Sequence, residues 1–162
     1  MGLKGQSAGG HTKGGEKQGQ AGGPRYVKAS LSRHASLPKK EILITDDEDT
    51  LRELIAGELK SKGYEIVSLA SKREALEWCR THHPDLIISD IQSPGMDGFQ
   101  FLRLLKSDTG TKSVPIVFLT GFADDRNAEI AREMGATDFI AKPCKITDFQ
   151  SVVERIIGKA RR

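Results

Sequence analysis

Between about residue 41 and residue 158 the chain alternates five short apolar runs with longer stretches of helical period, and this alternation restricts the possible folds most. The predicted strands are the apolar runs, at residues 42–45, 65–69, 86–89, 115–119 and 138–141. Three of them are nearly continuous runs of β-branched residues or leucine, as strands buried on both faces require. The pattern predicts an α/β fold: a doubly wound, five-stranded parallel sheet with crossover helices on both faces.

Helix start and stop signals lie between these runs. An apolar stripe predicts the first helix, and its members are Leu51, Leu54, Ile55 and Leu59. Gly63 follows this stripe where a left-handed cap residue ends a helix. A third helix is expected to begin near Gly98, and a fourth to cover residues 124–134, before Gly135.

Two capping-box patterns predict where the second and the last helix begin. Ser71 with Glu74 marks the second helix, and Thr147 with Gln150 marks the last one. The last helix also has an apolar stripe, which consists of Phe149, Val152, Val153, Ile156 and Ile157.

Size and composition favour a single globular domain. The chain has 162 residues, and its 37% hydrophobic and 29% charged residues are close to the average for globular chains. No apolar run approaches the ~20 residues of a membrane-spanning helix, and the N-terminal segment has no hydrophobic signal stretch. We expect a cytoplasmic protein in which the two cysteines, Cys79 and Cys144, stay reduced because that compartment is reducing. Neither cysteine has a metal-ligand partner at zinc-site spacing.

The N-terminal quarter differs from the rest. Nine glycines precede position 24, and residues 1–40 hold eight Lys or Arg against one Glu, a net charge of +7. The remaining chain holds 17 basic and 21 acidic residues, a net charge of −4. We expect residues 1–39 to be a disordered basic extension, residues 40–158 the domain, and residues 159–162 a basic tail. The extension could bind nucleic acid, or it could be a solvated linker or a misassigned start.

Polar residues follow four of the five predicted strands, at the sheet edge where ligands of such folds bind. They are Asp46 and Asp47 after the first strand, Asp90 after the third, Thr120 after the fourth and Lys142 after the fifth. Taken singly, the aspartates could serve a helix N-terminus and the lysine could be a solvated end charge. Together, the crowded carboxylates would raise one another's pKa values unless a cation neutralised them.

The residue types at this edge suit phosphoryl chemistry. Carboxylates with a backbone carbonyl and waters are ligands for Mg²⁺, and no His or Cys cluster favours zinc. A carboxylate beside Mg²⁺ can attack phosphorus and form an aspartyl phosphate. A hydroxyl donor and a lysine that converge on the same point can neutralise the phosphoryl oxygens, and Thr120 and Lys142 have these properties.

Residues 41–158 resemble a response-regulator receiver domain, the phosphoacceptor part of two-component signalling. Five fragments in family-like order support the resemblance: Ile-Thr-Asp46-Asp47-Glu, Pro84-Asp-Leu-Ile-Ile-Ser-Asp90, Pro94-Gly-Met-Asp-Gly98, Phe118-Leu-Thr120-Gly and Phe139-Ile-Ala-Lys142-Pro143. The resemblance implies a flavodoxin-like three-layer sandwich with strand order 2-1-3-4-5.

The resemblance also implies roles for the edge residues. Asp90 accepts the phosphoryl group. Asp47 and Asp90 bind Mg²⁺ directly together with the carbonyl of Gln92, and Asp46 acts mainly through metal-bound water.

A second group of implied roles concerns the response to phosphorylation. Thr120 and Lys142 contact the phosphoryl group, and the Lys142-Pro143 bond is expected to be cis. Thr120 then moves toward the phosphoryl group and Phe139 rotates inward, which changes the surface of the fourth helix, the fifth strand and the last helix. The alternative for Phe139 is an ordinary core aromatic.

Two positions depart from the family pattern without removing a catalytic group. Ser93 stands where many receiver domains have Met, and the bulky Phe122 lies two positions after Thr120. Gln92 and Phe122 flank the path of an attacking water in the resembling fold, so we expect them to affect the lifetime of the phosphoryl group.

The resemblance implies a phosphorelay response regulator, not a conventional enzyme. A histidine kinase or histidine phosphotransfer protein would phosphorylate Asp90, and a separate effector protein would bind the changed surface of a monomer or a phosphorylation-dependent dimer. One alternative is a pseudo-receiver that binds partners without phosphorylation. Another is a haloacid-dehalogenase-type phosphotransferase, which needs a second Asp where this chain has Gln92 and a cap domain that it lacks.

Overall fold

The structure, a computed structural model, describes residues 37–121 and 125–160, and all structural statements below concern these residues. The domain starts at Pro38. The predicted extension up to residue 36, Phe122, and residues 161–162 of the predicted tail lie outside the described residues.

A five-stranded parallel sheet forms the centre of the domain. Its strands are β1 (Glu41–Thr45), β2 (Glu65–Leu69), β3 (Leu86–Asp90), β4 (Ile116–Thr120) and β5 (Asp138–Ala141). They lie in the order β2-β1-β3-β4-β5, and every neighbouring pair is parallel. The predicted fold class and strand order are therefore confirmed, and the carboxyl ends of β1, β3 and β4 meet at one edge.

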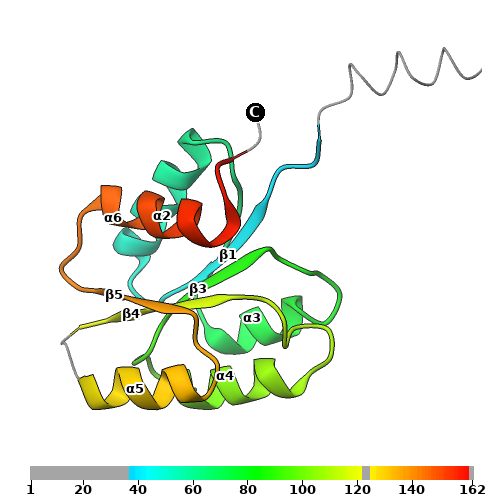
Figure 1. The fold of residues 1–162 in the computed structure, drawn as a ribbon, viewed down its shortest axis with the longest axis vertical. Helices are drawn as coiled ribbons and strands as arrows, with labels where there is room; N and C mark the ends of the chain where they lie inside the picture. The colour runs from blue at the N-terminus through cyan, green and yellow to red at the C-terminus, as the bar shows by residue number, and fades with distance from the viewer. Residues whose placement is uncertain (1–36, 122–124, 161–162) are drawn as a thin grey trace, which may run out of the picture. The chain divides into compact units, whose positions relative to one another are not determined.

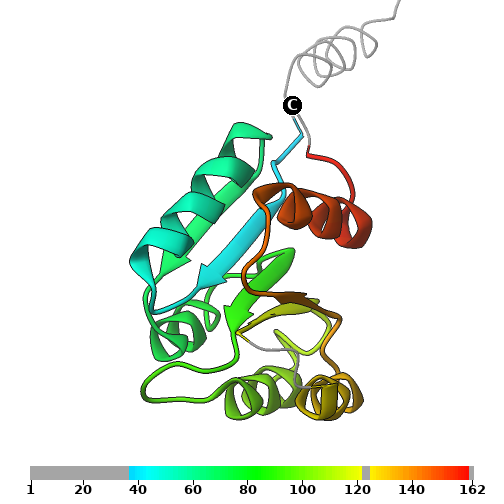
Figure 2. The same cartoon turned by 90° about the vertical axis from the view of Figure 1, so that its left-hand side faces the viewer.

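Helices cover both faces of the sheet. They are α2 (Asp49–Ser61), α3 (Lys72–Trp78), α4 (Gly98–Ser107), α5 (Asp125–Glu133) and α6 (Ile146–Ile157). Figures 1 and 2 show α2 and α6 on one face and α3, α4 and α5 on the other. This arrangement is the expected three-layer sandwich. None of the helices in the described ranges is long and apolar enough to cross a membrane.

Two apolar clusters hold the three layers together because successive strand residues point to opposite faces. Ile42 and Ile44 of β1 pack with Phe149 of α6 on one face, whereas Leu43 packs with Phe101 of α4 on the other. All five side chains are fully buried. Burial of such side chains stabilises the fold by about 1.5–3 kcal/mol each, so both helical layers are tightly fixed to the sheet.

Most helix ends agree with the predictions. The hydroxyl of Ser71 accepts a hydrogen bond from the backbone N–H of Glu74 at 3.1 Å, and α3 starts directly after Ser71. Gly63 and Gly135 follow α2 and α5 with positive φ angles of 105° and 108°, a backbone conformation that glycine adopts without strain.

The predicted start of the last helix is wrong. Helix α6 begins at Ile146, one residue before Thr147, so Thr147 lies in the first turn instead of capping it. The carboxylate of Asp148 accepts a hydrogen bond from the backbone N–H of Lys145 at 3.0 Å. Because Asp148 satisfies this N–H group, the helix starts earlier than the Thr147–Gln150 pattern indicated.

Candidate functional site

Three carboxylates meet at the carboxyl edge of the sheet. Asp46 and Asp47 follow β1, and Asp90 ends the neighbouring β3, whose Ser89 is paired with Thr45. One carboxylate oxygen from each of the three aspartates lies within 4.8 Å of the others. Asp46 and Asp90 are 0% and 2% exposed, whereas Asp47 is exposed to solvent. The predicted acidic cluster therefore exists, with two buried members and one open one.

A hydroxyl and an ammonium group complete the predicted set. Thr120 ends β4 and Lys142 follows β5, and the backbone N–H of Lys142 donates to the carbonyl of Thr120 at 2.6 Å. The peptide bond between Lys142 and Pro143 is cis, as expected. A cavity of about 270 Å³ lies beside them. Its polar lining residues are Asp90, Gln92, Thr120, Asn127 and Lys142.

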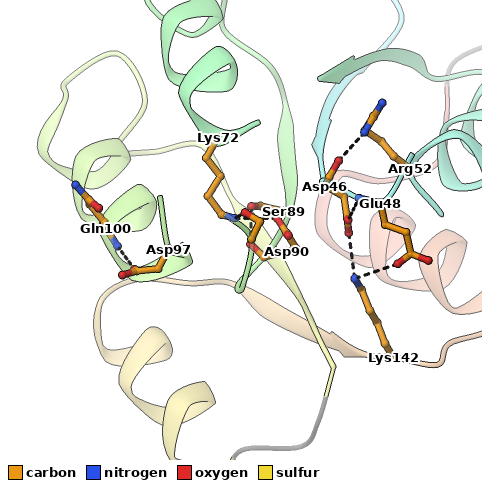
Figure 3. Close-up of polar contacts among 10 residues, drawn as sticks. Asp46, Glu48, Arg52, Lys72, Ser89, Asp90, Asp97, Gln100 and Lys142 are labelled. Carbon is orange, nitrogen blue, oxygen red and sulfur yellow. Dashed lines mark hydrogen bonds and ion pairs between the residues drawn. The ribbon is translucent and has the colours of Figure 1, made fainter. Parts of the chain in front are cut away.

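Asp46 is held in place from three directions. Its carboxylate accepts a hydrogen bond from the backbone N–H of Glu48 at 2.8 Å and one from the ammonium group of Lys142 at 3.2 Å. The guanidinium group of Arg52 donates to the backbone carbonyl of Asp46 at 2.6 Å and to the hydroxyl of Ser68 at 2.9 Å. These contacts tie the first turn of α2 and the end of β2 to Asp46. Figure 3 shows the contacts of Asp46 with Glu48, Arg52 and Lys142.

Arg52 was not predicted as a site residue. The predicted stripe of the first helix included Leu54, which is 57% exposed, whereas Arg52 is only 8% exposed. Arg52 lies three residues before Ile55 and seven before Leu59, and both of these apolar residues are buried. A charged residue at the spacing of a buried helical face was the signal in the sequence, because such a position needs polar partners inside the fold.

Lys72 is the second site residue that the sequence analysis missed. It is the first residue of α3, and its side chain is 1% exposed. Its ammonium group donates a hydrogen bond to Oδ1 of Asp90 at 2.9 Å and another to the hydroxyl of Ser93. Figure 3 shows Lys72 directed from α3 toward Asp90. A cation at a helix N-terminus opposes the helix dipole, and this unfavourable placement was the available signal.

The environment of Asp90 favours its neutral form. Burial raises the pKa of this carboxyl group above its ordinary value, and the charges of Asp46 and Asp47 raise it further. The hydrogen bond and the positive charge of Lys72 lower the pKa, but they only partly offset the effect of burial. Oδ2 of Asp90 is buried and has no hydrogen-bond partner within the described part of the chain. An additional cation or hydrogen-bond donor at Oδ2 would therefore stabilise the ionised form.

The donor set fits Mg²⁺. All three side chains offer carboxylate oxygens, the ligands that hard divalent cations prefer, and Oδ2 of Asp90 is available. The sequence argument from charge crowding is weaker than expected, because Lys142 lies beside Asp46 and Lys72 beside Asp90. The fit to Mg²⁺ therefore depends on the type and proximity of the ligand atoms and not on charge crowding alone.

Phe139 lies near the site without lining the cavity. It is half-buried, its ring centroid is 6.2 Å from that of Phe118, and the guanidinium carbon of Arg132 is 5.0 Å from its ring centroid. Gln92 lines the cavity. Phe122, the other residue predicted to flank the path of an attacking water, lies outside the described residues.

The fold and the site define a doubly wound α/β domain with an acidic pocket at the carboxyl edge of its sheet. The sequence profile of the response regulator receiver domain matches residues 42–154, and the chain belongs to this family of two-component signalling domains. Membership in this family of signalling domains excludes the haloacid-dehalogenase-type alternative.

Known relatives agree with this membership. The chain is 32% identical over 121 residues to the polar-differentiation response regulator DivK of Brucella ovis, covering 75% of this chain and 98% of the relative. It is similar to the chemotaxis response regulator CheY4 of Vibrio cholerae, with a TM-score of 0.69 and 29% identity over 72% of this chain and 98% of the other.

A second similar structure contains a metal ion. It is the receiver domain of a sensor histidine kinase from Pseudomonas aeruginosa, described with a magnesium ion coordinated in its active-site cleft. The TM-score is 0.67 and the identity is 29%, over 74% of this chain and 98% of the other. Magnesium coordination in the active-site cleft is thus described for a receiver domain of the same fold.

Proposed function

We propose that the protein is a phosphorelay response regulator whose Asp90 accepts a phosphoryl group from a histidine kinase or a histidine phosphotransfer protein. The observation that supports this most strongly is the position of Asp90. Its carboxylate ends β3 beside a cavity that Thr120 and Lys142 also line, and Oδ2 has no partner among the described residues. A carboxylate with an unpartnered oxygen, in the same cavity as two phosphate-binding groups, is suited to attack phosphorus.

The transfer step requires one bond to form and one to break. An oxygen of Asp90 attacks the phosphorus of a phosphohistidine, the new O–P bond forms, and the P–N bond breaks with its electron pair passing to the imidazole nitrogen. Thr120 donates a hydrogen bond to the phosphoryl group, and the ammonium group of Lys142 neutralises part of its charge. The ammonium group of Lys142 lies 3.2 Å from Oδ2 of Asp46, and Lys142 lines the same cavity as Asp90.

The residues that would hold Mg²⁺ are the three aspartates and Gln92. Asp47 and Asp90 would provide carboxylate ligands, Gln92 would provide its backbone carbonyl, and Asp46 would act mainly through metal-bound water. When bound, Mg²⁺ neutralises charge on the phosphoryl oxygens during the transfer. Arg52 fixes the backbone of Asp46 and so keeps this carboxylate directed at the site.

The output of the domain is a change of the surface formed by α5, β5 and α6. Thr120 at the end of β4 is paired with Ala141 of β5, so movement of Thr120 acts directly on the strand that carries Phe139. The half-buried Phe139 packs on Phe118 and rotates inward when Thr120 moves toward the phosphoryl group. A separate effector protein binds the changed surface. The regulator works in the cytoplasm as a monomer or a phosphorylation-dependent dimer. Any nucleic-acid binding belongs to residues 1–39.

Intact-mass measurement after incubation with acetyl phosphate and Mg²⁺ tests the proposed function. We expect one phosphoryl adduct on the wild type, none on Asp90→Asn, and none on the wild type after Mg²⁺ is chelated. Asp97→Asn is the matched control, because Asp97 caps α4 outside the cavity and asparagine caps equally well. No adduct on the wild type would instead support the pseudo-receiver alternative.

A further inference from the structure

Lys72 is a buried cation that the family roles inferred above do not use. The residue is 2% exposed, and its ammonium group contacts only two described side chains, Oδ1 of Asp90 and the hydroxyl of Ser93. A buried ammonium group costs several kcal/mol in lost hydration, and its place at the start of α3 opposes the helix dipole. The two contacts at the acceptor site are therefore what make this burial possible.

The charges at the acceptor edge are arranged as two separate pairs. Lys142 lies 3.2 Å from Oδ2 of Asp46, and Lys72 lies 2.9 Å from Oδ1 of Asp90. The side chain of Lys142 is 25% exposed and approaches from the end of β5, whereas the side chain of Lys72 is 1% exposed and approaches from the start of α3. Asp90 thus has its own counter-ion, which occupies Oδ1 and leaves Oδ2 without a partner.

We propose that Lys72 is a positioning residue of the phosphoacceptor site: it holds Asp90 through Oδ1 and competes with Mg²⁺ for the acceptor carboxylate. This inference rests on the proposed function. A fixed positive charge in contact with one metal ligand repels a divalent cation at the same ligand set. The site is therefore preformed without metal and binds Mg²⁺ more weakly than the three carboxylates alone would.

Ser93 fits this role as the second support of Lys72. Its hydroxyl accepts a hydrogen bond from the ammonium group and lies in the loop between β3 and α4. Lys72 therefore links the acceptor strand, this loop and α3. The Ser93 departure from the family pattern thus has a physical explanation in this chain, since the ammonium group needs a polar partner there.

Calorimetric measurement of Mg²⁺ binding tests the inference. We expect Lys72→Met to bind Mg²⁺ about tenfold more tightly than the wild type or better, because a unit charge next to the ligand set is removed. Lys72→Arg keeps the charge and should stay within about threefold of the wild type. The matched control is Arg73→Met, which removes an exposed positive charge one residue further along α3 and should change the affinity less than about threefold.

The inference would be overturned if Lys72→Met bound Mg²⁺ as weakly as the wild type or more weakly. Thermal unfolding in the absence of metal checks that the variants are folded. If Lys72→Met does not fold, Lys72→Gln is measured instead with the same expectation, because glutamine keeps a hydrogen-bond donor for Oδ1 without the charge. Acetyl phosphate labelling of the same samples separates the two proposals. If Asp90 is labelled but Lys72→Met binds Mg²⁺ with the same affinity as the wild type, only the role of Lys72 is refuted. The absence of labelling in every sample refutes the proposed function.

Discussion

Replacement of Gly98 by alanine should destabilise the domain, because there is no room for a side chain at this position. A Cβ atom on Gly98 would lie 2.8 Å from Cα and 3.0 Å from the carbonyl oxygen of Ile91, and 3.2 Å from Cε1 of Phe118. The backbone N–H of Gly98 also donates to that carbonyl of Ile91 at 2.7 Å. This contact closes the loop that carries Gln92 and Ser93 onto the start of α4.

The expected cost has two parts. Overpacking against the backbone costs about 1–3 kcal/mol, since no flexible side chain can move away. Weakening of the hydrogen bond from Gly98 to Ile91 costs about 1 kcal/mol more. The free energy of unfolding should therefore fall by about 2–4 kcal/mol, which for a domain of this size lowers Tm by about 8–16 °C.

Gly57→Ala is the matched control. Gly57 lies exposed within α2, and no atom lies within 4 Å of the position of its Cβ, so the same substitution should stabilise the domain by about 0.5–1 kcal/mol. Thermal and urea unfolding followed by circular dichroism measures both variants. A Gly98→Ala variant as stable as the wild type would refute the close packing of this loop on α4.

Three further substitutions test other parts of the account. Burial and the charge of Asp108 raise the pKa of Cys79 to about 11. In a Cys144→Ser background at pH 8, Ellman's reagent should therefore label Cys79 at least about 100-fold more slowly in the folded protein than in the urea-unfolded protein. Equally fast labelling of the folded protein would contradict this expectation. Arg52→Met should lower the free energy of unfolding by about 1–3 kcal/mol in urea titrations, because a backbone carbonyl loses its charged donor. Lys142→Ala should slow adduct formation about 100-fold while the adduct stays on Asp90, as measured by timed intact-mass analysis; an unchanged rate would remove this lysine from the transfer step.

The sheet and its acidic edge could be predicted because they depend on local patterns and on topology. Apolar runs identify the strands, and parallel strands bring the residues that follow them to one edge, so Asp46 and Asp90 could be paired from 44 positions apart. The N-cap of α6 was predicted at Thr147, two residues after the observed N-cap Lys145, because the carboxylate of Asp148 provides an alternative start for the helix.

Lys72 and Arg52 could not be predicted in the same way. Both lie in the first turn of a helix, where charged residues are usually solvated, and only the packing of the helix on the sheet directs them inward. Leu54 shows the reverse error, since it belongs to an apolar pattern and yet lies exposed while Arg52 occupies the buried face. The sequence thus predicted the carboxylates and Lys142, and not Arg52 and Lys72, the two buried cations that hold Asp46 and Asp90.

The most direct test of the central claim is to locate the phosphoryl group within the acidic cluster. Borohydride reduction of the acetyl phosphate-treated protein converts an aspartyl phosphate to homoserine, and peptide mass spectrometry then identifies the position. We predict homoserine at position 90 alone, formed only when Mg²⁺ is present. Homoserine at position 46 or 47, or at none of the three, would contradict the assignment of Asp90 as the phosphoacceptor.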